Sequence, residues 1–147
     1  FRSAMEKPEI TSVCLLVDKE EIGSVGASGM QSRFFENTVA EVMNAAGTYS
    51  ELALRRALKN SSVLSSDVSA AFDPNFPSVM TKRNAAELGK VDQGGGGTIA
   101  YILANYGMRV IDSGVAVLNM HAPWEIISKV DLYEAYRGYI AFLKEQA

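Results

Sequence analysis

The sequence predicts a layered α/β fold. Two observations support this class. Short apolar runs rich in β-branched residues alternate along the chain with longer segments whose apolar residues recur at helical spacing. The short runs are apolar almost throughout, which is typical of strands buried between two layers. With 147 residues, 48% of them hydrophobic, the chain can form one domain with a substantial core or a piece of a larger one.

The periodicity places the elements in chain order. Strands are expected at residues 10–17, 63–68, 109–112 and 115–118. Helices are expected from close to Ser28 to about Ala46, from the Thr48/Glu51 pair to Asn60, over residues 99–106, and from Ser128 onward. Ser28, Thr48 and Ser128 each stand three residues before a Gln, Glu or Asp, which is the spacing of a helix capping box. Gly47 and Gly107 are natural C-terminal stops.

Composition excludes several classes of partner. The formal net charge is −3, from 17 acidic and 14 basic residues, without large blocks of either sign. No nucleic-acid or anionic-membrane partner is therefore predicted. No apolar run approaches the length of a membrane-spanning helix. Cys14, the only cysteine, lies in an apolar run, so we expect a small core residue in a reducing, cytoplasmic compartment.

Four polar residues share one context and are candidates for chemistry. Glu20 and Glu21, Asp67, and His121 each follow an apolar, strand-like run. In open α/β sheets, ligands collect beyond the carboxyl ends of strands, and carboxylate oxygens with an imidazole nitrogen match zinc and related divalent ions. Taken alone, the glutamate pair fits a solvated acidic turn equally well, and a lone histidine is more often structural. The four positions together favour a metal site.

A run of four glycines, residues 94–97, allows a second interpretation. Backbone N–H groups leading into a helix could cradle an anion. The run lacks the lysine of a P-loop and the spacing of a dinucleotide fingerprint, so close backbone approach to a substrate or strand is at least as good an explanation.

Three motifs together resemble the aspartyl aminopeptidase family of dinuclear metallopeptidases, in particular its bacterial probable aminopeptidases. These are Asp-Lys-Glu-Glu-Ile-Gly-Ser (18–24), Ser-Ser-Asp-Val (65–68) and Met-His-Ala-Pro-Trp-Glu (120–125), in the family's order. The intervening residues 72–76, 92–100 and 110–114 match as well, so the resemblance extends from about Thr11 to Leu143. It implies a zinc-peptidase-like catalytic domain of layered α/β/α architecture with a mixed, mainly parallel sheet.

The resemblance also implies roles for the candidate residues. Glu20 is the expected general base, Glu21 and His121 are expected ligands of one metal ion, and Asp67 is an expected ligand of the other. Two divalent ions are implied, zinc first, with cobalt or manganese as alternatives. Asp112, Gly95 and Gly96 are expected to support the metals or to line the substrate pocket. The implied activity is release of the N-terminal residue from peptides by a cytoplasmic homo-oligomer.

Two departures from the family pattern limit this expectation. The family places a further His and a metal-bridging Asp before the glutamate pair, and this chain begins after that point. A family segment is also missing where Ala86 meets Glu87, so residues 1–147 are expected to be part of a catalytic domain, without the dimerisation domain. By itself the 147-residue chain is expected to be inactive and to expose apolar surface. The alternatives are a non-catalytic binding or assembly subunit and an anion-binding module built on residues 94–97.

Overall fold

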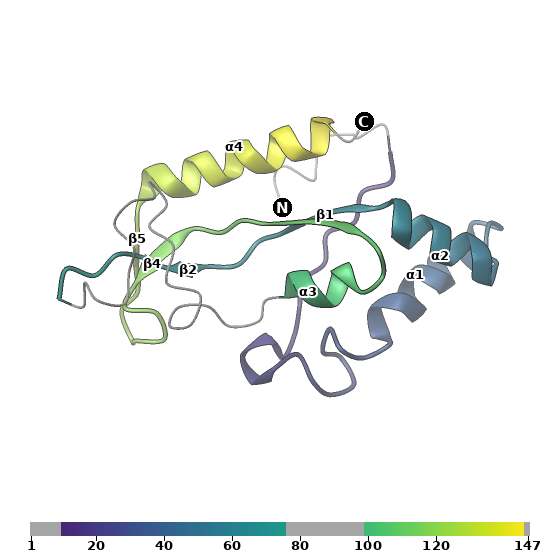
Figure 1. Ribbon diagram of the computed structural model, residues 1–147, viewed down its shortest axis with the longest axis horizontal. Coiled ribbons are helices and arrows are strands. Elements are labelled where there is room, and N and C mark those ends of the chain that lie inside the picture. Colours follow the sequence, from purple (N-terminus) through teal and green to yellow (C-terminus); the bar gives the residue numbers. More distant parts are fainter. Residues whose placement is uncertain (1–9, 76–98, 146–147) are drawn as a thin grey trace. The chain divides into compact units, whose positions relative to one another are not determined.

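The computed structural model describes residues 10–75 and 99–145, which fall into two compact units. Unit 1 contains the described residues up to 14, 66–75 and 112–145, and unit 2 contains 15–65 and 99–111. Figure 1 shows the elements of both units. Unit 2 holds η2 (Glu20–Ile22), α1 (Phe34–Ala45), α2 (Glu51–Asn60), β1 (Ser62–Ser65), α3 (Ile99–Ala104) and all but the last residue of β3, whose bounds are Arg109–Asp112. Unit 1 holds β2 (Ser69–Ala70), β4 (Ala116–Leu118), β5 (Ile126–Ile127) and α4 (Lys129–Glu145).

Unit 2 is built around one apolar cluster. Helix α2 contributes Leu54 and Leu58, which are four residues apart and therefore lie on the same face of the helix. Helix α3 adds two neighbouring apolar residues, and methionines from the adjoining loops complete the cluster; these residues are Ile102, Leu103, Met30 and Met108. Helices α1 and α2 pack against each other, and α3 packs on β1, which pairs with β3.

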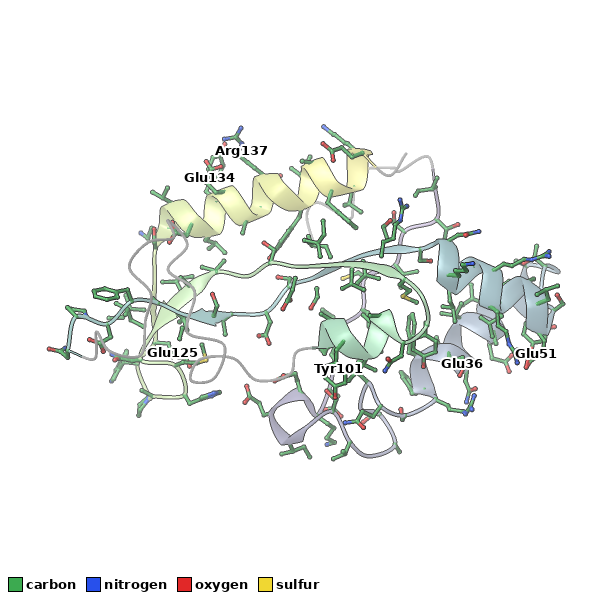
Figure 2. All side chains as sticks on the ribbon, viewed as in Figure 1. Glu36, Glu51, Tyr101, Glu125, Glu134 and Arg137 are labelled. Carbon is green, nitrogen blue, oxygen red and sulfur yellow. The ribbon has the colours of Figure 1, made fainter. Side chains whose placement is uncertain are left out.

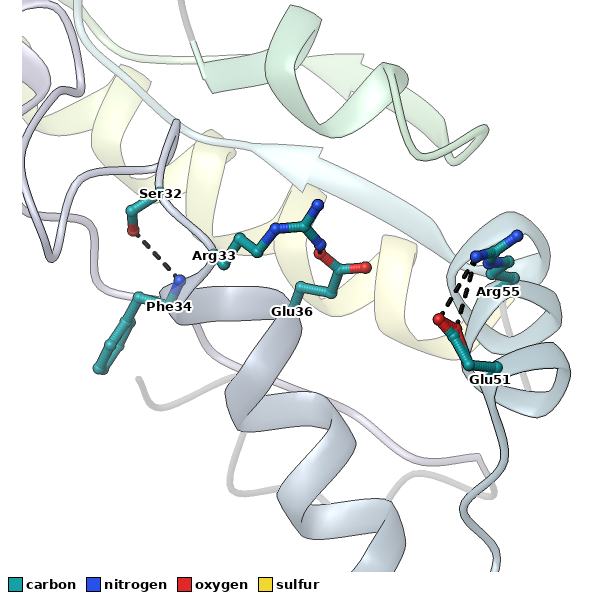
Figure 3. A network of polar contacts seen from close by, with 6 residues as sticks. All are labelled: Ser32, Arg33, Phe34, Glu36, Glu51 and Arg55. Carbon is teal, nitrogen blue, oxygen red and sulfur yellow. Dashed lines mark hydrogen bonds and ion pairs between the residues drawn. The ribbon is translucent and has the colours of Figure 1, made fainter.

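Helix α1 begins later than the capping-box spacing of Ser28 and Gln31 predicts. Its first residue is Phe34 with Arg33 at the N-cap position, and the Ser28 hydroxyl donates to Asp18 instead of capping the helix. The Ser32 Oγ accepts a hydrogen bond from the Phe34 N–H at 3.2 Å, and Arg33 forms an ion pair with Glu36 at 2.9 Å (Figure 3). The predicted end is confirmed: Gly47 has a φ of 70° and closes the last turn.

Helix α2 is capped by Ser50 rather than by the predicted Thr48. The Ser50 Oγ accepts a hydrogen bond from the Ala53 N–H at 3.1 Å, whereas the Thr48 hydroxyl donates to the Met43 carbonyl. Glu51 and Arg55 form an ion pair along the exposed face (Figure 3). The predicted end at Asn60 is confirmed.

The cap gives the first testable prediction. Ser50→Ala leaves the Ala53 N–H without its side-chain acceptor, so the free energy of unfolding should fall by about 1 kcal/mol. Urea unfolding followed by circular dichroism measures this change. Thr48→Ala is the comparison: a larger loss from Thr48→Ala than from Ser50→Ala would show that the cap is wrongly assigned.

Unit 1 contains a three-stranded mixed sheet in the order β2–β4–β5. Strands β2 and β4 are parallel, with Ser69 opposite Ala116, and β4 and β5 are antiparallel, with Val117 opposite Ile127. Val117 is buried at the centre. The predicted strand at 63–68 is shorter than expected, because β1 ends at Ser65 and a loop precedes β2.

The C-terminal helix α4 is confirmed with its cap. The Ser128 Oγ accepts a hydrogen bond from the Asp131 N–H at 3.3 Å. Glu134 and Arg137 form an ion pair at 3.2 Å and point outward from the helix (Figure 2). Tyr139 hydrogen-bonds through its hydroxyl to Ser66, which ties the helix to the loop before β2.

The first predicted strand is wrong. Residues 11–17 contain no assigned strand, and only Asp18 forms an isolated parallel bridge, with Gly29. Leu15 and Val17 pack against the core of unit 2, while Leu16 is 85% exposed, so the alternation of a strand is present without a strand ladder. Cys14 is exposed, which corrects the prediction of a core residue.

The α/β class is confirmed by helices combined with mixed sheets. Both strands predicted between residues 109 and 118 are present, and Gly107, with a φ of 80°, follows α3 as expected. None of the helices in the described part of the chain is long and apolar enough to cross a membrane. The glycine run and the junction between Ala86 and Glu87 lie outside the described residues.

Candidate metal centre

The glutamate pair lies in a tight turn of unit 2. Glu20 and Glu21 are the first two residues of the 3₁₀ turn η2, and Lys19, at its N-cap, has a φ of 66°. The turn is closed by hydrogen bonds from the Gly23 N–H to the Glu20 carbonyl at 2.9 Å and from the Ser24 N–H to the Lys19 carbonyl at 2.7 Å. Successive side chains of a 3₁₀ turn point about 120° apart. The two carboxylates therefore diverge, with Glu20 half-buried and Glu21 exposed.

Asp18 fixes the entrance to this turn. Its Oδ1 accepts a hydrogen bond from the Lys19 N–H at 2.9 Å, and its Oδ2 accepts one from the Ser28 hydroxyl at 2.7 Å. The Ser28 hydrogen bond holds the pKa of Asp18 below the usual value of an aspartate, and the charge of Lys19 lowers it further. The stability that this carboxylate contributes is therefore present above the usual aspartate pKa and is lost as the pH falls through the lowered value.

A second prediction follows from the cause of this shift. Ser28→Ala removes the hydroxyl that binds the charged carboxylate, so the pKa of Asp18 should rise toward its usual value. An NMR titration of the Asp18 side chain measures the change. If the pKa stayed as low as in the unsubstituted protein, Ser28 would not be the main cause of the shift.

Asp67 lies in unit 1, two residues before β2. Its Oδ1 accepts a hydrogen bond from the Val68 N–H at 2.7 Å, and the side chain is half-buried. Gly114, two residues before β4, runs directly beside it: a methyl group on Gly114 would overlap the backbone carbonyl of Asp67. The preceding residue, Ser66, forms a hydrogen bond between its hydroxyl and that of Tyr139 in α4.

His121 follows β4 in an exposed loop. Its φ is 66°, and its N–H donates a hydrogen bond to the Glu125 Oε1 at 2.6 Å. Glu125 is labelled in Figure 2. The Ala122 N–H donates to the Asn119 carbonyl at 2.9 Å, which closes the turn that contains His121.

Backbone strain is concentrated at the predicted site residues. Within the described ranges, the non-glycine residues with positive φ are Lys19, Ser24, Asn119 and His121. Two of these flank the Glu20–Glu21 turn, one is His121 itself, and one precedes it by two residues. Such conformations cost about 1–3 kcal/mol each and persist where the surroundings enforce them, often at functional sites. No sequence pattern indicated this strain.

The predicted ligands are divided between the two units. The glutamate pair lies in unit 2, and Asp67 and His121 lie in unit 1 at opposite ends of the parallel β2–β4 pair. Counting only the described residues, neither unit gathers three His, Cys, Asp or Glu side chains as a metal site would require. The glutamate pair was expected to lie beyond the carboxyl end of a strand, but no strand precedes it.

The donor chemistry nevertheless fits a divalent ion. Carboxylates and an imidazole are ligands that zinc accepts, and each is presented by a loop with a defined backbone. The ligand assignment stays a prediction. Asp112 is exposed at the end of β3, and Gly95 and Gly96 lie outside the described residues, so their supporting roles also stay predictions.

An α/β fold that presents carboxylates and an imidazole on tight loops is typical of metal-dependent hydrolases. The family model for aminopeptidase I zinc metalloproteases (M18) matches residues 2–91 and 83–143. The chain belongs to this family.

Relatives of known name agree with the assignment. A probable M18 family aminopeptidase 1 from Clostridium acetobutylicum is 54% identical over 184 residues, covering 95% of this chain and 40% of that protein. The corresponding protein of Thermotoga maritima is 35% identical, covering 94% and 41%. The crystal structure of the Clostridium aminopeptidase I superposes with a TM-score of 0.71 at 53% identity, over 87% of this chain and 37% of that one. The M18 aminopeptidase structure from Thermotoga maritima gives 0.76 at 34% identity, over 87% and 39%.

The chain spans about 40% of the length of these relatives. The alignment with the Clostridium protein covers 184 residues, whereas 95% of this 147-residue chain is about 140 residues. About 44 positions of the Clostridium protein within the alignment therefore have no counterpart in this chain. The two family-model matches overlap at residues 83–91, which contain the junction of Ala86 and Glu87.

Proposed function

We propose that this chain is part of the catalytic domain of a metallo-aminopeptidase that releases the N-terminal residue from peptides. One observation carries the proposal: two adjacent carboxylates are held apart in a strained, hydrogen-bonded turn, in a chain that belongs to a zinc metalloprotease family. The positive φ of Lys19 and of Ser24 supports this proposal over a solvated acidic turn, because such conformations cluster at functional sites.

The two glutamates take different roles in this proposal. The half-buried Glu20 is the general base, taking a proton from the attacking water at its carboxylate and passing it to the leaving amine. The exposed Glu21 is a metal ligand together with His121, and Asp67 is a ligand of a second ion. When bound, the two divalent ions supply Lewis acidity and a nucleophile at neutral pH. Zinc is the first choice, and cobalt or manganese suits the same donors.

Metal analysis combined with an aminoacyl-anilide assay on the intact polypeptide tests the proposal. We expect about two divalent ions for each chain and release of the anilide that a chelator abolishes and added zinc restores. A polypeptide that binds metal without releasing the anilide would be a non-catalytic binding or assembly subunit. We also propose that the protein is a homo-oligomer in the cytoplasm. Light scattering of the purified polypeptide tests its oligomeric state.

We further propose that a segment of the natural polypeptide belongs between Ala86 and Glu87. The overlap of the two family matches at 83–91 and the unmatched positions of the relative support this. Trypsin cleaves after Arg83 and Lys90, so an uninterrupted chain would yield the peptide Asn-Ala-Ala-Glu-Leu-Gly-Lys, residues 84–90. Detection of that peptide by mass spectrometry in a digest of the natural protein would contradict the proposal.

A further inference from the structure

We propose that Asp18, Ser28 and Gln31 are positioning residues that clamp the Glu20–Glu21 turn from both ends, an inference that rests on the proposed function. The clamp is the closed loop of residues 18–31 in unit 2. The motifs that identified the candidate ligands gave no role to Asp18, Ser28 or Gln31.

The first half of the clamp lies before the turn. Asp18 and Gly29 form a parallel bridge, and the Ser28 hydroxyl donates to the Asp18 Oδ2 at 2.7 Å. The other oxygen of Asp18 binds the Lys19 N–H. The far end of the loop is therefore tied to the residues immediately preceding Glu20.

The second half lies after the turn. The Gln31 Nε2 donates to the Gly23 carbonyl at 2.6 Å, and the Gln31 N–H donates to the Ser24 carbonyl at 3.0 Å. One residue thus holds both residues that follow the 3₁₀ turn. Gly29 allows this closure, because a methyl group there would overlap the backbone of Ser24 and Val25.

The clamp should affect the reaction more than it affects stability. The side chains of Asp18, Ser28 and Gln31 are exposed, and an exposed hydrogen bond contributes little net free energy to folding. A displacement of about 1 Å of a catalytic group, in contrast, can lower the rate by about 10²-fold. Because Ser24 is buried with a φ of 57°, the turn needs external restraint to keep its conformation.

The test compares Ser28→Ala and Gln31→Met with Ser28→Thr in the intact polypeptide. Loss of the hydroxyl or of the amide donor should lower kcat by about 10–100-fold, with little change in KM. Zinc affinity, measured by equilibrium dialysis, should fall as well because Glu21 is displaced. Ser28→Thr keeps the hydroxyl and should restore both quantities. Ser61→Ala is the matched control, since its hydroxyl binds the Ala57 carbonyl at the end of α2, outside the loop.

The outcomes separate the two proposals. If the unsubstituted protein is active and both loop variants keep its kcat and zinc affinity, the clamp is overturned. If kcat falls only in parallel with the unfolding midpoint and Ser28→Thr does not rescue it, the loop is merely structural and the inference is overturned. An unsubstituted protein that binds zinc without turnover overturns the proposed function, while the zinc affinities of the variants still decide the clamp. An unsubstituted protein that binds neither zinc, cobalt nor manganese overturns both.

Discussion

Glu20→Gln is expected to lower turnover by at least about 100-fold while metal remains bound. The amide has nearly the shape of the carboxylate but cannot accept the proton that the proposed base must carry. The half-buried position of Glu20 in η2 should tolerate the change, because the hydrogen bonds that close the turn are formed by its backbone and its neighbours.

Anilide release and metal content of the intact polypeptide, measured on the same samples, test this expectation. Glu41→Gln, an exposed substitution of the same chemistry on α1, is the control and should leave turnover unchanged. Glu21→Gln separates the paired roles, since it should lose metal as well as activity. Normal turnover in Glu20→Gln would remove Glu20 from the role of base.

Gly114→Ala is expected to destabilise unit 1 strongly. The added methyl group would overlap the carbonyl of Asp67, and a backbone cannot yield by changing a rotamer. Relief would require β2 to shift against β4, which would break the hydrogen bonds from Ser69 to Val115 at 3.1 Å and from Ala71 to Val117 at 2.8 Å. Overpacking of this kind costs about 1–3 kcal/mol, occasionally more.

A matched glycine lies in the same unit. Gly138 is in α4 with no atom within 4 Å of an added methyl group, so Gly138→Ala should stabilise the helix by about 0.5–1 kcal/mol. Urea unfolding of both variants gives the comparison. Zinc affinity of Gly114→Ala should also fall, because Asp67 moves with its backbone. A Gly114→Ala protein as stable as the unsubstituted one would show that the two segments do not approach closely.

The sequence predicted best what local periodicity determines. Helices α1, α2 and α4 lie where apolar residues recur at helical spacing, and Ser128 caps α4 as its spacing indicated. The prediction that Ser28 caps α1 was wrong because the Ser28 hydroxyl donates to Asp18, ten residues away in sequence. A tertiary contact of this kind leaves no trace in a capping pattern.

The candidate site was predictable as residue types and not as geometry. Glu20, Glu21, Asp67 and His121 were found from their context and from the family motifs. The positive φ of Lys19 could not be anticipated, because lysine does not favour that conformation, and the single His121 carries no turn pattern that would specify it. The close approach of Gly114 to Asp67 depends on strand register, which a single sequence does not specify.

Residues 10–17 have a consequence for handling the protein. The segment has the residues of a buried strand but no strand ladder, and Val13 and Leu16 are 69% and 85% exposed. Extended apolar chain of this kind is a template for pairing with another molecule. Because Cys14 is exposed within it, two copies that pair along this segment could become covalently linked by air oxidation. A preparation of the 147-residue chain should therefore form aggregates that a reducing agent partly dissolves, and Cys14→Ser should abolish the covalent fraction.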